Sequence, residues 1–215
     1  MCSWPGKGIK GLLLRLVHTH IDRLILWSTV QRRLVIENYK VPPAKISLIH
    51  YFVDEKFFRP LARETDMILS VGSEMRDYPT LLKALEGLDI RCHIAAGELK
   101  GVKTEWVKKV EAVVGLPSNI TVGRRNAREL RELYARSRFV VIPLLPTDTD
   151  NGITCMLEAM AMGRPVICSR TEGQVDVLKD GETGLYVPVG DPQALRAAIE
   201  YLWNNPDVAD RMGRA

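Results

Sequence analysis

Cysteine and long apolar runs are both scarce in this sequence of 215 residues. The 4 cysteines lie far apart and form no C-x-x-C pair, which argues against a zinc site and a disulfide framework. His18 and His20 lack companion ligands, so we expect no metal there. The longest early apolar run, residues 12–17, is broken by Arg15 and is far shorter than the ~20 residues of a membrane span. We therefore expect a cytoplasmic protein whose thiols are reduced: Cys2, Cys92, Cys155 and Cys168.

Net charge of either sign is also small, at 30 basic minus 26 acidic residues, or +4. Residues 1–60 hold 10 Lys and Arg against 4 Asp and Glu, which leaves 20 against 22 in residues 61–215. Because a nucleic-acid-binding protein is expected to carry a broader basic face, we expect no nucleic-acid partner. The basic first quarter, with leucines beside Lys7, Lys10 and Arg15, leaves open a peripheral contact with the acidic inner face of a membrane.

From residue 67 onward, short apolar runs alternate with segments of helical periodicity. The runs lack in-out alternation, which is typical of parallel strands covered on both faces. The alternation predicts an α/β fold with a doubly wound, Rossmann-like parallel sheet. The expected strands are 68–72, 92–97, 120–123, 139–145 and 165–169, and the expected helices include 81–88, 106–114, 127–133, 154–162 and 195–202.

The first sixty residues follow a different pattern. A strand is expected at 22–28, a helix at 29–39 and a second strand at 45–51. These elements are too few for a domain of their own. They either extend the edge of the later sheet or belong to a second domain.

Ligands of an open parallel sheet bind beyond the carboxyl ends of its strands. The loop after strand 68–72 carries Gly72, Ser73 and Arg76 and leads into a helix, so it suits an anion. Alternatively, Arg76 pairs with Glu74 or Asp77. The G-x-G-x-x-G fingerprint is missing, which argues against a nicotinamide enzyme.

The loop after strand 139–145 is the most informative. Asp150 and Gly152 precede an almost entirely apolar helix whose lone carboxylate is Glu158. Gly152 lets backbone N–H groups turn toward a phosphate. A buried carboxylate needs hydrogen-bond donors, which ligand hydroxyls or neighbouring backbone amides would supply. A third loop, residues 171–174, is consistent with a further ligand contact.

Together these segments resemble a known family. Asp150 and Glu158 are separated by seven residues, residues 157–167 read LEAMAMGRPVI, and residues 171–173 and 180–188 follow at fitting distances. Over residues 20–215 the chain resembles the nucleotide-sugar-binding half of a retaining glycosyltransferase of the group 1 family, which has the two-domain GT-B fold. The family's E-x7-E pattern falls on Asp150 and Glu158.

The resemblance implies a role for each residue of this pattern. Glu158 would hold the ribose hydroxyls of the donor nucleotide, and Asp150 would face the hydroxyls of the donor sugar. Gly152, Ile153 and Thr154 would present backbone amides to sugar or phosphate.

The family's phosphate-binding stretch falls on Gly72, Ser73 and Arg76. Arg76, where the family usually has Lys, would neutralise the leaving diphosphate without a metal ion or other cofactor. Arg124 or Arg125, after strand 120–123, is expected near the nucleotide base.

Three departures from the family pattern stand out. Asp150 is one methylene shorter than the usual Glu, and Ser73 replaces the usual Arg. Residues 1–60 correspond to a remnant of the N-terminal acceptor domain with the interdomain linker, and residues 61–215 to the donor domain. We therefore expect a fragment that carries the donor site and is inactive without its acceptor half.

Three other functions remain open from the sequence. Asp148-Thr149-Asp150 spells the D-x-D of metal-dependent glycosyltransferases. Sugar-nucleotide 2-epimerases share the two-domain fold. A non-catalytic nucleotide-sugar-binding module would need no acceptor site. The arginine-rich residues 124–138 suit either a polyanion or an exposed helix whose charges pair at four-residue spacing, as Arg125–Glu129, Arg128–Glu132 and Glu132–Arg136 do.

Overall fold

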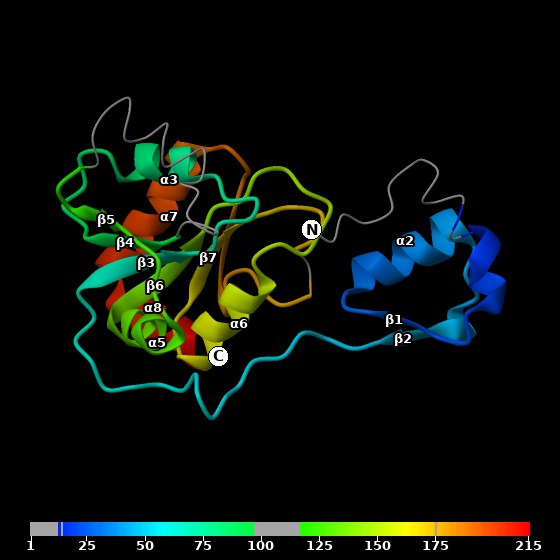
Figure 1. The fold of residues 1–215 in the computed structure, drawn as a ribbon. Coiled ribbons are helices and arrows are strands. Elements are labelled where there is room, and N and C mark those ends of the chain that lie inside the picture. The colour runs from blue at the N-terminus through cyan, green and yellow to red at the C-terminus, as the bar shows by residue number, and fades with distance from the viewer. Residues whose placement is uncertain (1–12, 14, 97–116, 175) are drawn as a thin grey trace.

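A computed structural model describes residues 13, 15–96, 117–174 and 176–215, which form a large α/β unit and a small one (Figure 1). The expected helix around Trp106 lies outside the described residues.

The large unit is built on a six-stranded sheet in which every neighbouring pair of strands is parallel. The strand order is β5-β4-β3-β6-β7-β8. This confirms the doubly wound sheet and adds an edge strand, β8, that the apolar runs did not predict. The strands are β3 (Met67–Val71), β4 (Cys92–Ala95), β5 (Ile120–Val122), β6 (Ser137–Ile142), β7 (Val166–Ser169) and β8 (Gly184–Val187).

Helices cover both faces of this sheet, which explains why its strands are apolar throughout. On one face α3 (Tyr78–Leu85), α7 (Pro192–Asn204) and α8 (Pro206–Arg214) pack on Ile68, Phe139 and Val141. On the other face α5 (Ala127–Arg136) and α6 (Ile153–Ala161) pack on Leu69, Val140 and Ile142. Because successive side chains of a strand point to opposite faces, every strand except β5 contributes to both cores.

Polar caps begin several of these helices. Asp77 accepts a hydrogen bond from Thr80 N in α3, and Asp191 accepts one from Ala194 N in α7, where Pro192 follows as expected. Asn126 and Glu129 form a capping box at the start of α5.

The expected four-residue ion pairs along α5 were wrong. Glu129 is used in the capping box, Glu132 pairs with Arg63 at 3.2 Å, and Arg136 pairs with Asp66 at 2.8 Å. The charged side chains of α5 therefore cap its own N-terminus and pair with Arg63 and Asp66, which precede β3.

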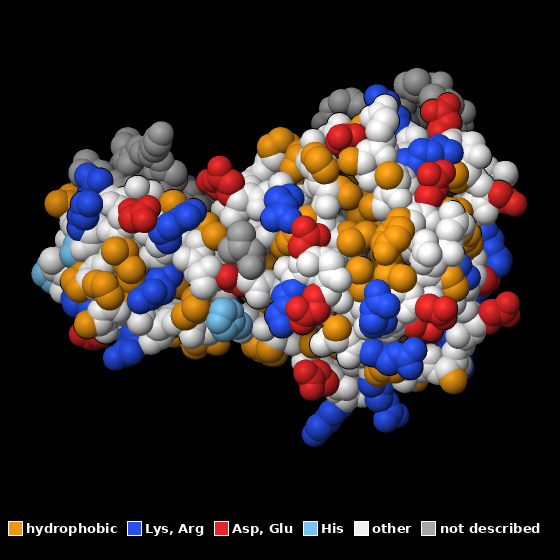
Figure 2. Space-filling model, turned by 180° about the vertical axis from the view of Figure 1, so that it is seen from behind, with side chains coloured by type: hydrophobic (Ala, Val, Ile, Leu, Met, Phe, Trp, Pro, Cys, Tyr) orange, Lys and Arg blue, Asp and Glu red, His pale blue; other side chains and the backbone are white. Residues whose placement is uncertain are grey.

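The small unit has its own two-stranded parallel sheet, so the first sixty residues do not extend the edge of the large one. It consists of β1 (Leu24–Leu26), α2 (Thr29–Tyr39) and β2 (Ile46–Leu48), with short 3₁₀ turns at His18–His20 and Pro43–Lys45. Its core is small and comprises Leu26, Val35, Tyr39 and Val41. Figure 2 shows Lys and Arg side chains gathered over this unit, and a narrow waist between it and the large unit.

The chain reverses its direction of travel across the sheet between β3 and β6. From β3 it moves outward to β5, and from β6 it moves outward to β8, so the loops after β3 and β6 leave in opposite directions. Two backbone hydrogen bonds tie these loops together, Leu145 N to Met75 O and Asp77 N to Pro143 O, each of 3.0 Å. A reversal of this kind is where open α/β sheets bind ligands.

Candidate functional site

A cleft of about 890 Å³ lies between this reversal point and the small unit. Its floor comes from the loops after β3 and β6 and the first turn of α6. Its opposite wall comes from β1, from Trp27 just after it, from α2 with Gln31, and from Tyr51 of the connecting segment. The cleft brings together most of the predicted site residues: Gly72, Ser73, Arg76, Asp150, Gly152, Ile153 and Thr154.

Arg76 is the most unusual of these residues, because it is a buried cation with 7 % of its surface exposed. Its Nε donates to Val71 O at 2.8 Å and its Nη1 to Glu74 O at 2.7 Å. Its Nη2 lies 3.7 Å from Cys155 Sγ. The predicted alternative, a pairing with the carboxylate of Glu74 or Asp77, is not found.

The charge of Arg76 has no partner of opposite sign within the described residues, where no carboxylate lies within ion-pair distance of it. Burial raises the pKa of the Cys155 thiol, so this neighbour is neutral. Of the five N–H donors of a guanidinium, three are engaged. Since a buried charge is costly unless it is paired, this arrangement favours an anion in the cleft.

Two glycines let the guanidinium lie this close to the backbone. Gly72 and Gly152 both have positive φ, +97° and +89°. A Cβ on Gly72 would lie 2.5 Å from Arg76 Nη2, and one on Gly152 would lie 3.3 Å from it. Larger residues at either position would displace the cation.

Gly152 is also the N-cap of α6, whose first backbone amides have no partner inside the helix. Ile153 and Thr154 supply these amides at the wall of the cleft. The helix N-terminus carries a partial positive charge, so it and Arg76 favour an anion at the same place.

Asp150 is held from the other side of the cleft. Gln31 Nε2, on α2, lies 3.0 Å from Asp150 Oδ1 and 3.2 Å from Oδ2. Gln31 Oε1 accepts a hydrogen bond from Trp27 N at 2.9 Å, which fixes the orientation of the amide. These two residues are 119 positions apart in the chain, and no sequence pattern predicted their contact.

Glu158 lies on α6 but does not line the cleft. Its half-buried carboxylate accepts a hydrogen bond of 2.8 Å from Tyr134 Oη on α5. Burial raises the pKa of Glu158, and the Tyr134 hydroxyl opposes this change. Backbone amides were the protein partners expected for this carboxylate, whereas its observed partner is a tyrosine hydroxyl.

Arg124 is not brought to the cleft either. It follows β5, the edge strand, which is separated from β3 by β4. Its role near a nucleotide base stays a prediction.

A second aspartate, Asp176, also contacts the small unit, and this contact was not predicted. Asp176 Oδ2 accepts a hydrogen bond of 2.7 Å from Thr29 N, and Oδ1 accepts one of 2.5 Å from Thr29 Oγ1. Asp150 and Asp176 therefore both face the positively charged start of α2. Ser28, Thr29 and Gln31 make the first turn of α2 mostly polar, but no sequence pattern links this turn to Asp150 or Asp176.

Asp148 and Asp150, the two acids of the D-x-D spelling, both line the cleft. Among the described residues, no group of three or more His, Cys, Asp or Glu side chains is placed to hold a metal ion. Among the helices that the structure describes, none is long and apolar enough to cross a membrane.

A family model for the group 1 glycosyl transferases matches residues 72–205, which contain both site loops and α6. The chain belongs to this family. The match confirms the resemblance seen in the Asp150–Glu158 pattern.

Among curated relatives, D-inositol 3-phosphate glycosyltransferase of Frankia alni is 26% identical, over 90% of this chain and 54% of its own length. The chain thus spans about half the length of that relative. Among solved structures, Anabaena Alr3699/HepE in complex with UDP superposes with a TM-score of 0.78 at 16% identity, covering 94% of this chain and 61% of that one.

The C-terminal domain of a group 1 glycosyltransferase, LpcC of Francisella tularensis, gives a TM-score of 0.62 at 16% identity. It covers 76% of this chain and 93% of that domain. The six-stranded unit therefore has the fold of the C-terminal half of a GT-B glycosyltransferase.

Proposed function

We propose that this chain carries the donor site of a retaining glycosyltransferase that moves a sugar from a nucleoside diphosphate sugar to an acceptor. The observation that carries the proposal is the buried, unpaired charge of Arg76 beside the N-terminus of α6. Both features lie at the reversal point of the sheet, and both would be neutralised by a diphosphate. A cleft of about 890 Å³ is also large enough for such a donor.

In the proposed reaction, the bond from the anomeric carbon to the leaving phosphate oxygen breaks, and the acceptor hydroxyl oxygen bonds to the same face of that carbon. The acceptor proton passes to the leaving phosphate oxygen, so atoms and charges balance. Arg76 and the amides of Ile153 and Thr154 would stabilise the charge that develops on the diphosphate. Asp150 would orient the sugar through its hydroxyls, and Glu158 would bind the ribose.

We further propose that no metal ion takes part. Arg76 and the helix N-terminus already supply positive potential, and Asp150 is engaged by the Gln31 amide. Residues 1–60 would correspond to part of the acceptor domain, so the donor would bind between the small unit and the large unit.

Calorimetric titration of UDP, GDP, ADP and dTDP into the chain tests this proposal. We expect at least one of them to bind, and the affinity to survive excess EDTA. Binding that disappears with EDTA and returns with Mn²⁺ would favour the D-x-D alternative. Incubation with the matching nucleotide sugar separates transfer to an acceptor from epimerisation at C2 of the sugar and from binding without turnover.

We also propose that the small unit rests on an acidic membrane surface. Leu13 and Leu16 are 58 % and 65 % exposed, and the unit is basic. Arg15 instead donates to Asn38 O, so it contributes less to such a surface than the sequence suggested. Sedimentation with vesicles should show binding when phosphatidylserine is present and none with phosphatidylcholine alone.

A further inference from the structure

A second cavity, of about 250 Å³, opens beside the donor cleft. The two share Trp27, Tyr51, Asp150 and Ile153, whereas Gly72, Ser73 and Arg76 line only the larger one. The second cavity therefore adjoins the cleft at Asp150 and at Ile153, whose amide is proposed to face the diphosphate, and it does not reach Arg76.

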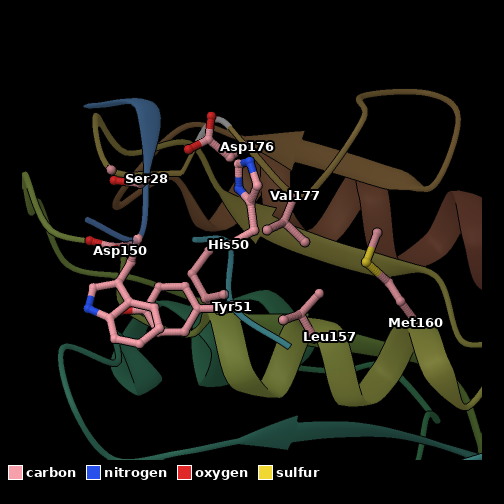
Figure 3. Close-up of a pocket in the computed structure, with 11 residues that line it drawn as sticks. Ser28, His50, Tyr51, Asp150, Leu157, Met160, Asp176 and Val177 are labelled. Carbon is pink, nitrogen blue, oxygen red and sulfur yellow. The ribbon is translucent and has the colours of Figure 1, made fainter. Parts of the chain in front are cut away.

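The lining of this cavity has a polar end and an apolar end. In Figure 3, Ser28, Asp150 and Asp176 lie at one end and Leu157, Met160 and Val177 at the other. A ligand that fills it must therefore carry hydroxyl or amine hydrogens on one side and C–H groups on the other.

Two aromatic rings form part of the same wall. Trp27 and Tyr51 are stacked, with ring centroids 5.2 Å apart and planes inclined by 27°. Trp27 keeps 40 % of its surface exposed. Because an aromatic face carries negative potential, it attracts polarised C–H groups such as those on one face of a pyranose ring.

The carboxylates of Asp150 and Asp176 are the main polar groups at this end, and the imidazole of His50 lies beside Asp176. Each oxygen of Asp176 accepts one hydrogen bond from Thr29, and a carboxylate oxygen has two lone pairs, so each retains capacity for a ligand hydroxyl. None of the described residues that line the cavity is Lys or Arg. This combination suits a neutral, hydroxyl-rich ring and disfavours a phosphate.

The volume sets the size of that ligand. Drug-sized ligands occupy pockets of about 300–1,000 Å³, so a cavity of about 250 Å³ holds one ring.

We propose that this second cavity binds one sugar ring of a saccharide acceptor, with its receiving hydroxyl directed toward Asp150. The assignment rests on the proposed function, because it takes the larger cleft as the donor site. Transfer requires the two sugars to be adjacent, and Asp150 lies at the junction of the two cavities. The bonds made and broken are those of the transfer step given above.

Saturation-transfer NMR on the 215-residue chain tests the assignment, with methyl glycosides of glucose, galactose, mannose and rhamnose as probes. The nucleoside diphosphate that binds best is present throughout. We expect at least one glycoside to receive saturation at its ring C–H protons and to bind together with the nucleotide sugar. Trp27→Ala should weaken glycoside binding at least tenfold. The cavity-filling Met160→Phe should do the same and leave nucleotide affinity unchanged, because Met160 lines the second cavity and not the donor cleft.

Phe52→Ala is the matched control, because Phe52 adjoins Tyr51 but is 81 % exposed and lines neither cavity. It should change neither affinity, and thermal melts verify that all variants fold. The assignment is overturned if no glycoside binds, if Met160→Phe leaves glycoside binding intact, or if the glycoside competes with the nucleotide sugar. Binding of octanol in place of the glycosides would assign the cavity to an alkyl chain. Glycoside binding without any nucleotide binding would instead refute the proposed function and, with it, the acceptor role.

Discussion

The two units of the molecule differ in how they are buried and in what they bring to the cleft. The six-stranded sheet is covered on both faces, and most of its strand residues are fully buried. In the small unit, Ile25 and Ile49 remain 52 % and 46 % exposed. The large unit contributes the backbone amides at the start of α6 and the buried cation of Arg76 to the cleft. The small unit contributes the side chains of Gln31 and Trp27. We infer that the first sets affinity for the nucleotide and the second adjusts the contacts of the sugars.

The largest expected effect comes from removing the cation of the large unit. Arg76→Met should lower the affinity for the nucleoside diphosphate by more than ~100-fold, because charge-assisted hydrogen bonds contribute about 1.5–3 kcal/mol each. Calorimetry measures the loss, and a thermal melt verifies the fold. Arg128→Met on the exposed face of α5 is the matched control and should bind normally. Equal affinities of the two variants would refute the role of Arg76.

Glu158→Gln should produce the next largest effect. It keeps the shape but exchanges one acceptor oxygen for a donor, so nucleotide affinity should fall roughly 10- to 150-fold. Because burial raises the pKa of Glu158, its charge is a cost in the unliganded chain, and the melting temperature should not decrease. Unaltered affinity together with a large decrease in melting temperature would show that Glu158 only supports Tyr134.

Acidification should separate the same two roles of Glu158. The folded chain holds this proton to a higher pH than the unfolded chain does, because burial raises the pKa above its ordinary value of 4.5. The contribution of Glu158 to stability is therefore fully present below 4.5 and is lost as the pH rises through the folded value. Nucleotide affinity should change in the opposite sense and rise over that window.

Titrations from pH 4 to 8 on the wild type and on Glu158→Gln measure this difference. The terminal phosphate of the nucleotide titrates at about pH 6 and affects both proteins equally. The wild type should show an additional inflection that the variant lacks. Identical profiles would mean that the ribose is bound elsewhere.

The smallest effect should come from the small unit. Gln31→Ala removes the amide that orients Asp150, at a part-exposed contact of about 0.5–1.5 kcal/mol. Affinity for the nucleotide sugar should fall about 2- to 13-fold, while affinity for the nucleoside diphosphate alone stays unchanged. Gln31→Glu should be worse than Ala because it places like charges together. If both ligands lose affinity equally, the contrast between the two units does not hold.

The same contrast separates what the sequence predicted from what it could not. Apolar runs without alternation predicted the parallel sheet, because both faces are covered, and Gly72 and Gly152 each indicated a loop that suits an anion. The edge strand β8 was missed because Gly184 and Tyr186 interrupt its apolar pattern. The Gln31–Asp150 and Thr29–Asp176 contacts join positions 119 and 147 residues apart, and neither has a local signature. The family pattern made Glu158 a candidate, and its partner Tyr134 depends on how α5 packs against α6.

The most direct test of the account is a crystal structure of this chain with UDP. We predict that the diphosphate oxygens lie within about 2.7–3.2 Å of an Arg76 guanidinium nitrogen and of the backbone nitrogen of Ile153 or Thr154. The ribose hydroxyls should contact Glu158. A diphosphate bound away from the start of α6, with Arg76 still in contact with protein atoms alone, would contradict the central claim.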